Sequence, residues 1–439
     1  MVIMSIACYQ SKDVHPDQLG NPLIEALRPT LTNKDAAGVL ARRPAISLDK
    51  ERLLPPHIRV HSVAAISDMY VPDIKTLELY AMVDMQMKRS LERHNPFSAE
   101  GQRYLDSVQA KVLAAVSDDQ RRIAKAVKEG KEPLSALGKR LPDIRSILVT
   151  GASGMGKSSA INRVLALNDQ VIEHSNYMGQ PYHQKQLVWL SVFAPLNASI
   201  SGLCHSIFAA VDEALGLPVD TGYAKQYDKK HRTNDVLISR VAQVLATHHL
   251  GILHIDDLHR IADGTGANKA ALISFIMQLS DVVGVPMILS GTGKLMKMLR
   301  GSFEVSRRVI AAGSVEFELP PEYVKGDGFA NLANALFKFS LLPVSEDALE
   351  DMKLYLFDRS QGITAVAVNL FLQAQMWGLR EEADFMTKEL IDHAYARIKP
   401  LHSALSALRR KDVDAIRDFE DIASLDQINR NFFSGALGP

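Results

Sequence analysis

A run of residues near the middle of the chain has the spacing of a phosphate-binding loop, G-x-x-x-x-G-K-[ST]. It consists of Gly151, Ala152, Ser153, Gly154, Met155, Gly156, Lys157 and Ser158. Glycine lets such a backbone curl so that successive N–H groups point at phosphate oxygens. Lys157 is expected to reach the β- and γ-phosphates, and the Ser158 hydroxyl to bind Mg²⁺. With the adjacent Ser159, these residues are the predicted nucleotide-binding set.

The segments on either side of the loop supply the elements that it needs. Residues 144–150 are typical of a buried parallel strand that enters the loop. Residues 158–165 are typical of a helix that leaves it, so the phosphates would meet a helix N-terminus. A chance match in a glycine-rich turn would not have both flanks. The sequence therefore predicts a nucleoside triphosphate site.

Two adjacent carboxylates follow a second apolar segment, residues 252–255, which predicts a Walker B strand. Asp256 is expected to hold Mg²⁺, and Asp257 to polarise the attacking water. A strand that merely ends in an acidic turn is the alternative. His254, inside the same strand, is expected to pack in the core rather than to bind a ligand.

Polar side chains also stand at the tip of a strand predicted over residues 286–290. Ser290 and Thr292 could both orient the water or contact the γ-phosphate, and Thr292 is taken as the catalytic candidate. A helix cap is the alternative, because Ser and Thr favour such positions.

A pair of arginines, Arg307 and Arg308, precedes the last predicted strand. In a ring-forming ATPase, an arginine at this place stabilises the transferring phosphoryl group in a neighbour's site. A solvated basic turn would explain the same pair.

The elements that position these residues form an α/β pattern. Strands are expected at residues 144–150, 186–192, 251–255, 286–290 and 315–319. Strands that alternate with helices indicate a parallel sheet covered on both faces. The predicted organisation is an extended arm at 1–60, a helical region at 61–140, a nucleotide-binding αβα core at 141–320, a helical lid at 321–399 and a tail at 400–439 that could bind a partner.

Composition sets outer bounds on the function. The chain has 439 residues and no formal net charge, so binding to nucleic acid must come from local patches or from many subunits side by side. Two cysteines far apart in sequence cannot make a zinc site alone, and they do not indicate a disulfide framework. No apolar run approaches the roughly 18 residues of a membrane span. We expect a soluble cytoplasmic protein.

The strand order, the lid and the late arginines resemble AAA+ ATPases rather than kinases or small GTPases. Within that class, the chain resembles the TnsC/TniB family of transposon target-selection ATPases. The segments that carry the resemblance are Asn21–Leu27, Arg93–Pro96, Leu148–Ser158, Ile255–His259, Gly284–Thr292 and Ser360–Thr364. The N-terminal segments and Ser360–Thr364 are the discriminating ones, because Walker motifs occur in many unrelated ATPases.

The chain departs from the expected pattern at two places. Asp257 stands where such ATPases usually have glutamate, which favours slow hydrolysis. The Gln361-Gly362-Ile363 segment carries no arginine where many AAA+ proteins have a second sensor. How the lid would respond to the nucleotide is therefore open.

The resemblance implies ATP and Mg²⁺ as cofactors and ATP-dependent assembly into rings or filaments on duplex DNA. Such a homo-oligomer would link a target-site selector protein to recruitment or activation of a transposase, and hydrolysis would serve disassembly. The alternatives are a signalling or defence ATPase switch without a DNA role, and a remodeller of the helicase-loader type.

A basic and aromatic segment, residues 223–234, lies where related assemblies line a central pore. Its candidate DNA-binding residues are Lys225, Lys229, Lys230 and Arg232. Cations repeated around a ring would contact successive phosphates without reading bases. A solvated loop beside the active site is the alternative.

Overall fold

The structure is a computed structural model, and it describes residues 4–10, 14–116, 146–227, 234–263, 266–299, 303–412 and 415–416. At its centre lies a parallel sheet with the strand order β5-β6-β7-β2-β8. The strands are β2 Ile147–Gly151, β5 Trp189–Phe193, β6 Ile252–Asp256, β7 Met287–Ser290 and β8 Ser314–Phe317. β2, which leads into the phosphate-binding loop, therefore lies between β7 and β8.

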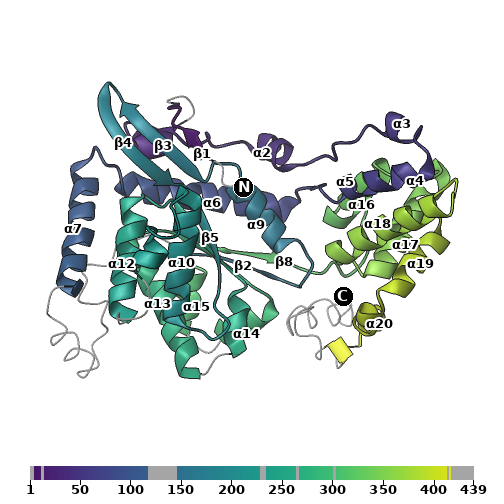
Figure 1. Ribbon diagram of the computed structural model, residues 1–439. Coiled ribbons are helices and arrows are strands. Elements are labelled where there is room, and N and C mark those ends of the chain that lie inside the picture. Colours follow the sequence, from purple (N-terminus) through teal and green to yellow (C-terminus); the bar gives the residue numbers. More distant parts are fainter. Residues whose placement is uncertain are drawn as a thin grey trace, which may run out of the picture.

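Helices cover both faces of this sheet, so its central strands are apolar on both sides (Figure 1). One face packs on α10 Ile200–Leu215, α12 Asn234–Thr247 and α13 Gly266–Val283. The other packs on α6 Ile74–Arg93 and α9 Lys157–Leu165. The predicted α/β class with a parallel sheet is confirmed, and four of the five predicted strands occur with their ends shifted by a few residues.

A second, smaller sheet was not predicted from the sequence. It has the order β1-β3-β4 and consists of β1 Met4–Ile6, β3 Val171–Tyr177 and β4 Gln180–Leu187. β3 and β4 form an antiparallel hairpin, and β1 joins β3 in parallel. The strand expected over 186–192 thus combines the end of β4 with most of β5.

The described part of the N-terminal arm, residues 4–10 and 14–60, runs from the small sheet across the core to the lid (Figure 1). Its helices are α1 Pro22–Glu25, α2 Asn33–Leu40, α3 Leu48–Glu51 and α4 Pro56–Arg59, and a 3-10 turn precedes them at Pro16–Gln18. A second 3-10 turn, Val60–Ser62, leads from the arm into α5 Val63–Ile66. Leu23 and Ile24 are buried in the core cluster, whereas Ile46 and Leu48 are partly buried against the lid cluster. The same segment therefore contributes to two hydrophobic cores.

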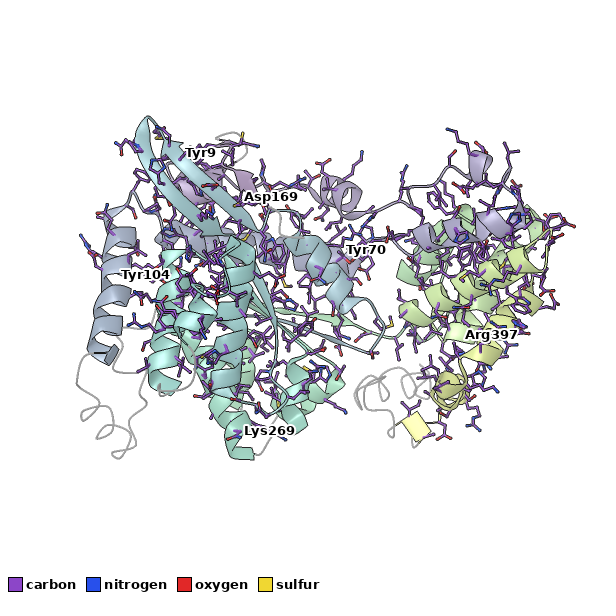
Figure 2. All side chains as sticks on the ribbon, in the orientation of Figure 1. Tyr9, Tyr70, Tyr104, Asp169, Lys269 and Arg397 are labelled. Atoms are coloured by element: carbon purple, nitrogen blue, oxygen red, sulfur yellow. The ribbon has the colours of Figure 1, made fainter. Side chains whose placement is uncertain are left out.

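Tyr70 marks the point where the chain returns from the lid to the core (Figure 2). Its hydroxyl lies 2.9 Å from the Thr76 hydroxyl at the start of α6, and the Arg163 guanidinium of α9 lies 5.6 Å from its ring centre. The ring therefore joins the start of α6 to the helix that follows the phosphate-binding loop.

The lid is a helical bundle around its own apolar cluster. Its helices are α16 Gly328–Lys338, α17 Glu346–Ser360, α18 Thr364–Arg380 and α19 Lys388–Arg397. The remaining elements are α7 Ala99–Val116, α11 Tyr223–Gln226, α14 Gly293–Leu299, α15 Phe303–Val309, α20 His402–Arg410 and 3-10 turns at Leu258–Asp263 and Lys399–Leu401. α7 packs on α12, and α20 packs beside α17.

The two cysteines are both free, Cys8 exposed and Cys204 buried. Within the described residues, no helix combines the length and the apolar character that a membrane span requires.

Candidate nucleotide-binding site

The loop between β2 and α9 needs glycine at several of its positions. Gly154 and Gly156 have φ values of 80° and 88°, in the left-handed region that side chains disfavour. Gly151 has φ 146°, and a Cβ there would lie 2.2 Å from the Phe317 carbonyl oxygen of β8. Of the other predicted loop residues, Ala152 is buried, Met155 is half-buried, and Ser153, Ser158 and Ser159 are exposed. The main-chain conformation of the loop, rather than its side chains, thus forms the phosphate site.

Lys157 lies at the first position of α9 and points back over the loop. Its ammonium donates to the Gly151 and Ala152 carbonyls, at 2.9 and 2.7 Å. These contacts hold a positive charge at the loop, where phosphate oxygens would bind.

Asp256 ends β6 and is held by hydrogen bonds from three sides. Its Oδ1 accepts from the Ser290 hydroxyl at 2.5 Å and from the Asp257 N–H at 2.8 Å, and the Ser158 hydroxyl also bonds the carboxylate. Burial acts to raise the pKa of this carboxyl, but the hydrogen bonds and the nearby His254 outweigh it, so the pKa lies below its ordinary value. Asp256 is therefore an ionised acceptor at neutral pH.

The donor set fits Mg²⁺. Asp256 and Ser158 offer a carboxylate and a hydroxyl, and Mg²⁺ prefers oxygen ligands from one or two side chains together with substrate phosphates. Among the described residues, no group of three or more His, Cys, Asp and Glu side chains could hold a metal ion alone. A metal here would depend on the bound nucleotide.

Asp257 adopts a backbone conformation that the sequence did not reveal. Its φ is 55°, a left-handed value that Asp and Asn tolerate better than most residues. Its carboxylate oxygens lie 3.7 Å from Arg260 Nε and 3.9 Å from His259 Nδ1, and its side chain is 37% exposed. It is open enough to contact a water molecule beside the site.

Ser290 and Thr292, the two strand-tip candidates, have different surroundings. The Ser290 hydroxyl is committed to Asp256 and lies 2.9 Å from His254 Nε2. The Thr292 hydroxyl is buried and has no hydrogen-bond partner among the described residues. A buried hydroxyl without a partner costs free energy, so Thr292 is the more suitable of the two to bind a ligand or water.

The two arginines lie on α15 and differ in exposure. Arg307 is exposed, whereas Arg308 is half-buried and donates to the Met277 carbonyl of α13 at 3.5 Å. Arg307 is therefore the one that a neighbouring subunit could reach without disturbing the core.

The lid contacts the phosphate-binding loop directly, through residues that were not expected to do so. The Ala365 N–H donates to the Gly154 carbonyl at 2.9 Å. A Cβ placed on Gly154 would lie 3.1 Å from Ile363 Cγ2 and 3.2 Å from Ala365 Cβ. Ile363 also shares an apolar cluster with Ala152 and with Leu405 of α20. The lid segment that lacks a sensor arginine is thus connected to the phosphate-binding loop by a main-chain hydrogen bond and by apolar contacts.

The predicted DNA-binding segment is only partly described. Lys225 is exposed on α11, whereas Lys229, Lys230 and Arg232 lie outside the described residues. The aromatic members of this segment belong to the core. Tyr227 is buried, with its ring 5.1 Å from that of Phe208, so it is not available for stacking on bases.

Ser191 of β5 was not predicted as a site residue, yet its hydroxyl lies 2.8 Å from His254 Nδ1. The proximity of His254 to the site was predictable from the sequence, because residues 254 and 256 are two positions apart on a strand and their side chains therefore share a face. His254 is buried, as expected, but it is linked to the site through Ser290.

Residues 143–299 match the family model of the AAA domain. Similar solved structures include the Walker-type ATPase PABY2304 of Pyrococcus abyssi (15% identity, 66% of this chain and 84% of that chain, TM-score 0.40), the ORC1 protein of Aeropyrum pernix in complex with DNA (16%, 75% and 82%, 0.41) and the RuvB Holliday junction branch migration motor of Thermotoga maritima (12%, 75% and 87%, 0.36). No curated protein sequence matches the chain. This match and the parallel sheet together give the chain an AAA+ P-loop fold of the α/β class.

Proposed function

We propose that this chain is an ATP-dependent regulator of DNA transposition that assembles on duplex target DNA. In this role it links a target-site selector to recruitment or activation of a transposase, and slow hydrolysis allows disassembly. The ATPase part rests on one observation above all, the ionised Asp256 held by Ser290 and Ser158 beside a complete phosphate-binding loop. The transposition part rests on the family resemblance.

The residues divide the reaction between them. Loop N–H groups and Lys157 bind the phosphates, and Asp256 with Ser158 would hold Mg²⁺, which neutralises phosphate charge when bound. Asp257 takes the proton of the attacking water, and Thr292 orients that water. Arg307 or Arg308 of a neighbouring subunit stabilises charge on the transferring phosphoryl group.

The two N-terminal segments that carry the resemblance lie side by side, because each donates a hydrogen bond to a residue close to the other in sequence. The Asn21 amide donates to the Leu91 carbonyl at 2.8 Å, and the Asn95 amide donates to the Gly20 carbonyl at 3.2 Å. They form one unit at the end of α6 rather than two unrelated matches.

DNA would contact a ring or filament of subunits through Lys225, with Lys229, Lys230 and Arg232 of the same segment. Exposure of Lys225 supports this, since a cation must reach phosphate oxygens to displace counterions. The tail at 400–439 is the proposed segment for a protein partner, and the cytoplasm is the proposed location. Within that tail, α20 packs beside the lid, and residues 417–439 lie outside the described residues.

The first experiment measures ATPase rate and particle size with and without duplex DNA, for the wild type, Lys157→Ala and Asp257→Asn. We expect ATP and DNA together to produce large assemblies in the wild type. Lys157→Ala should lose them, and Asp257→Asn should keep them longer because hydrolysis is slowed. If DNA changes neither rate nor size in the wild type, the DNA platform is rejected and the protein-only ATPase switch becomes the better account.

A second experiment tests the DNA contact itself. Charge reversal of Lys225, Lys229, Lys230 and Arg232 should abolish DNA-dependent assembly while nucleotide binding survives. Lys338→Glu, an exposed lysine at the end of α16 in the lid, is the matched control and should assemble normally. Unchanged assembly in the reversed variant would rule this segment out.

A further inference from the structure

Four polar side chains form a continuous hydrogen-bonded chain across three neighbouring strands of the sheet, β5, β6 and β7. Ser191 Oγ of β5 lies 2.8 Å from His254 Nδ1 of β6, and His254 Nε2 lies 2.9 Å from Ser290 Oγ of β7. Ser290 Oγ in turn lies 2.5 Å from Asp256 Oδ1. His254 is completely buried. We call this set the polar chain; it ends on the carboxylate that is the candidate ligand of Mg²⁺.

Strand register explains why these residues meet. Ser191 is the direct partner of His254 in the β5–β6 pairing, and Ile288 is the partner of His254 in the β6–β7 pairing. Ser290 lies two residues beyond Ile288, and Asp256 two residues beyond His254. Because side chains repeat every two residues along a strand, all four members share one face of the sheet.

That face is otherwise apolar, which makes the polar chain costly unless every member is paired. Ile252 and Ile288 of the same face are fully buried in the core cluster. A buried imidazole or hydroxyl without a partner would cost about 1–3 kcal/mol. His254 has a partner on each ring nitrogen, so it keeps a single orientation.

The direction of the hydrogen bonds follows from the carboxylate. At neutral pH an aspartate has no proton and can only accept, so the Ser290 hydroxyl donates to Asp256. The Ser290 oxygen must then accept from His254 Nε2–H, since its own hydrogen is already used. His254 Nδ1 consequently carries no proton and accepts from the Ser191 hydroxyl.

Ser290 has a competing acceptor, and this gives His254 its importance. The Ile255 carbonyl lies 3.5 Å from Ser290 Oγ, so the hydroxyl could turn away from Asp256. His254 itself is 3.9 Å from Asp256 Oδ1, beyond hydrogen-bond distance, and so acts only through Ser290. The donated Nε2–H holds the Ser290 oxygen on one side and leaves its hydrogen directed at the carboxylate.

We infer that His254 is a positioning residue that orients Asp256 for Mg²⁺ through Ser290, with Ser191 fixing its ring. The inference rests on the proposed ATPase function, because it concerns the same metal and nucleotide. It does not depend on DNA or on transposition. Outer partners of metal ligands are worth about 10–100-fold in metal affinity, which sets the size of the expected effect.

The test measures binding of a fluorescent ATP analogue in excess Mg²⁺ and in EDTA, and takes the ratio of the two dissociation constants. His254→Leu should reduce the enhancement by Mg²⁺ by about 10-fold or more, with the affinity in EDTA unchanged. His254→Gln should keep most of the enhancement, because its amide N–H can replace Nε2–H. Ser191→Ala should show an enhancement by Mg²⁺ between those of His254→Leu and the wild type.

His174→Leu is the matched control. His174 is also buried in a sheet and bonded on both ring nitrogens, to Tyr9 and Gln186 at 2.9 Å each, but in the small sheet away from the site. This variant should lower thermal stability while the enhancement by Mg²⁺ stays at the wild-type value. A purely structural role of His254 would make both leucine variants behave alike.

The outcomes separate the two proposals. If the wild type shows no Mg²⁺-dependent nucleotide binding, the ATPase proposal fails and this inference fails with it. If the wild type does and His254→Leu has the same enhancement, only the inference is overturned. Should His254→Leu not fold, His254→Gln and His254→Asn decide, since the shorter amide of asparagine cannot reach Ser290. Equal enhancement in these two variants would then reject the role of His254.

Discussion

The side-chain amide of Asn21 donates a 2.8 Å hydrogen bond to the main-chain carbonyl of Leu91, across 70 residues of sequence. The other end of the same amide accepts from the Leu23 N–H at 3.1 Å and so caps α1. One buried side chain thus begins the first helix of the arm and fastens it to the end of α6. It places the arm on the core before the arm continues to the lid.

Asn21→Ala should lower the free energy of unfolding by about 2–3 kcal/mol, because the cap of α1 and the buried hydrogen bond to the Leu91 carbonyl are both lost. Urea unfolding followed by circular dichroism measures this. The control is Asn33→Ala, an exposed residue at the start of α2. A loss as small as that of the control would mean that the Asn21–Leu91 contact does not hold the arm.

Local motifs made the central site predictable. The phosphate-binding loop and the carboxylates after β6 are fixed by residue type and spacing, since each job is done by neighbours in sequence. The left-handed backbone of Asp257 and the pairing of Arg308 with the Met277 carbonyl left no such trace. They depend on how separate segments meet.

The small sheet was missed for a related reason. Its strands include buried polar residues, His174 and Gln186, which break the apolar pattern of a strand. They are tolerated because His174 Nε2 lies 2.9 Å from Gln186 Oε1, and Gln186 Nε2 donates to the Leu23 carbonyl of the arm. The Leu23 carbonyl that pairs with Gln186 of β4 is more than a hundred residues away in sequence, so no local sequence pattern could have predicted this pairing.

Acidification should destabilise the protein through buried histidines. Burial, together with the charge of Arg93, lowers the pKa of His94 to about 4, and His94 stacks on Tyr104 of α7. Burial and the nearby His94, His174 and His248 lower the pKa of His249 to about 3. The unfolded chain, with a His pKa near 6.5, binds protons that the folded chain does not. Stability is therefore full above about pH 6.5 and falls as the pH drops toward 4.

Urea midpoints at pH 7.5, 6.0 and 5.0 measure this dependence. His94→Phe keeps a ring to stack on Tyr104 but cannot take up a proton, so its stability should fall less steeply with pH than that of the wild type. Carboxylates titrate equally in both proteins and cancel in the difference. Parallel curves for the two proteins would show that His94 does not contribute.

The conformation of Asp257 determines which substitutions there are informative. Asn tolerates left-handed φ about as well as Asp, so Asp257→Asn should fold with a wild-type urea midpoint. Hydrolysis should fall by about 10²–10⁴-fold, the usual contribution of a general base, while nucleotide affinity changes little. A single-turnover assay with radiolabelled ATP measures the rate. If hydrolysis persists at the wild-type rate, the base must be sought elsewhere.

Asp257→Glu restores the residue that such sites usually carry, but at a backbone position that does not favour it. We expect a loss of about 1 kcal/mol in stability from the left-handed φ, the size of the penalty for an ordinary L-residue there. A rate above that of the wild type in this variant would mean that side-chain length limits hydrolysis. A rate at or below it would mean that the backbone conformation does.

The contact between Ile363 and Gly154 should carry the response of the lid to nucleotide. Ile363 is 5% exposed, and Ile363→Ala should cost about 2–5 kcal/mol as a cavity in the cluster. The informative readout is hydrogen exchange at the start of α18, where the Ala365 N–H bonds the Gly154 carbonyl. ATP should slow this exchange in the wild type and do so less in Ile363→Ala, because the loop and the lid then have fewer shared contacts.

Leu408→Ala is the control, since Leu408 lies in the same cluster but is not within 4 Å of a Cβ on Gly154. It should lose stability yet keep the response to ATP, whereas an equal response in all three proteins would place the coupling outside this contact.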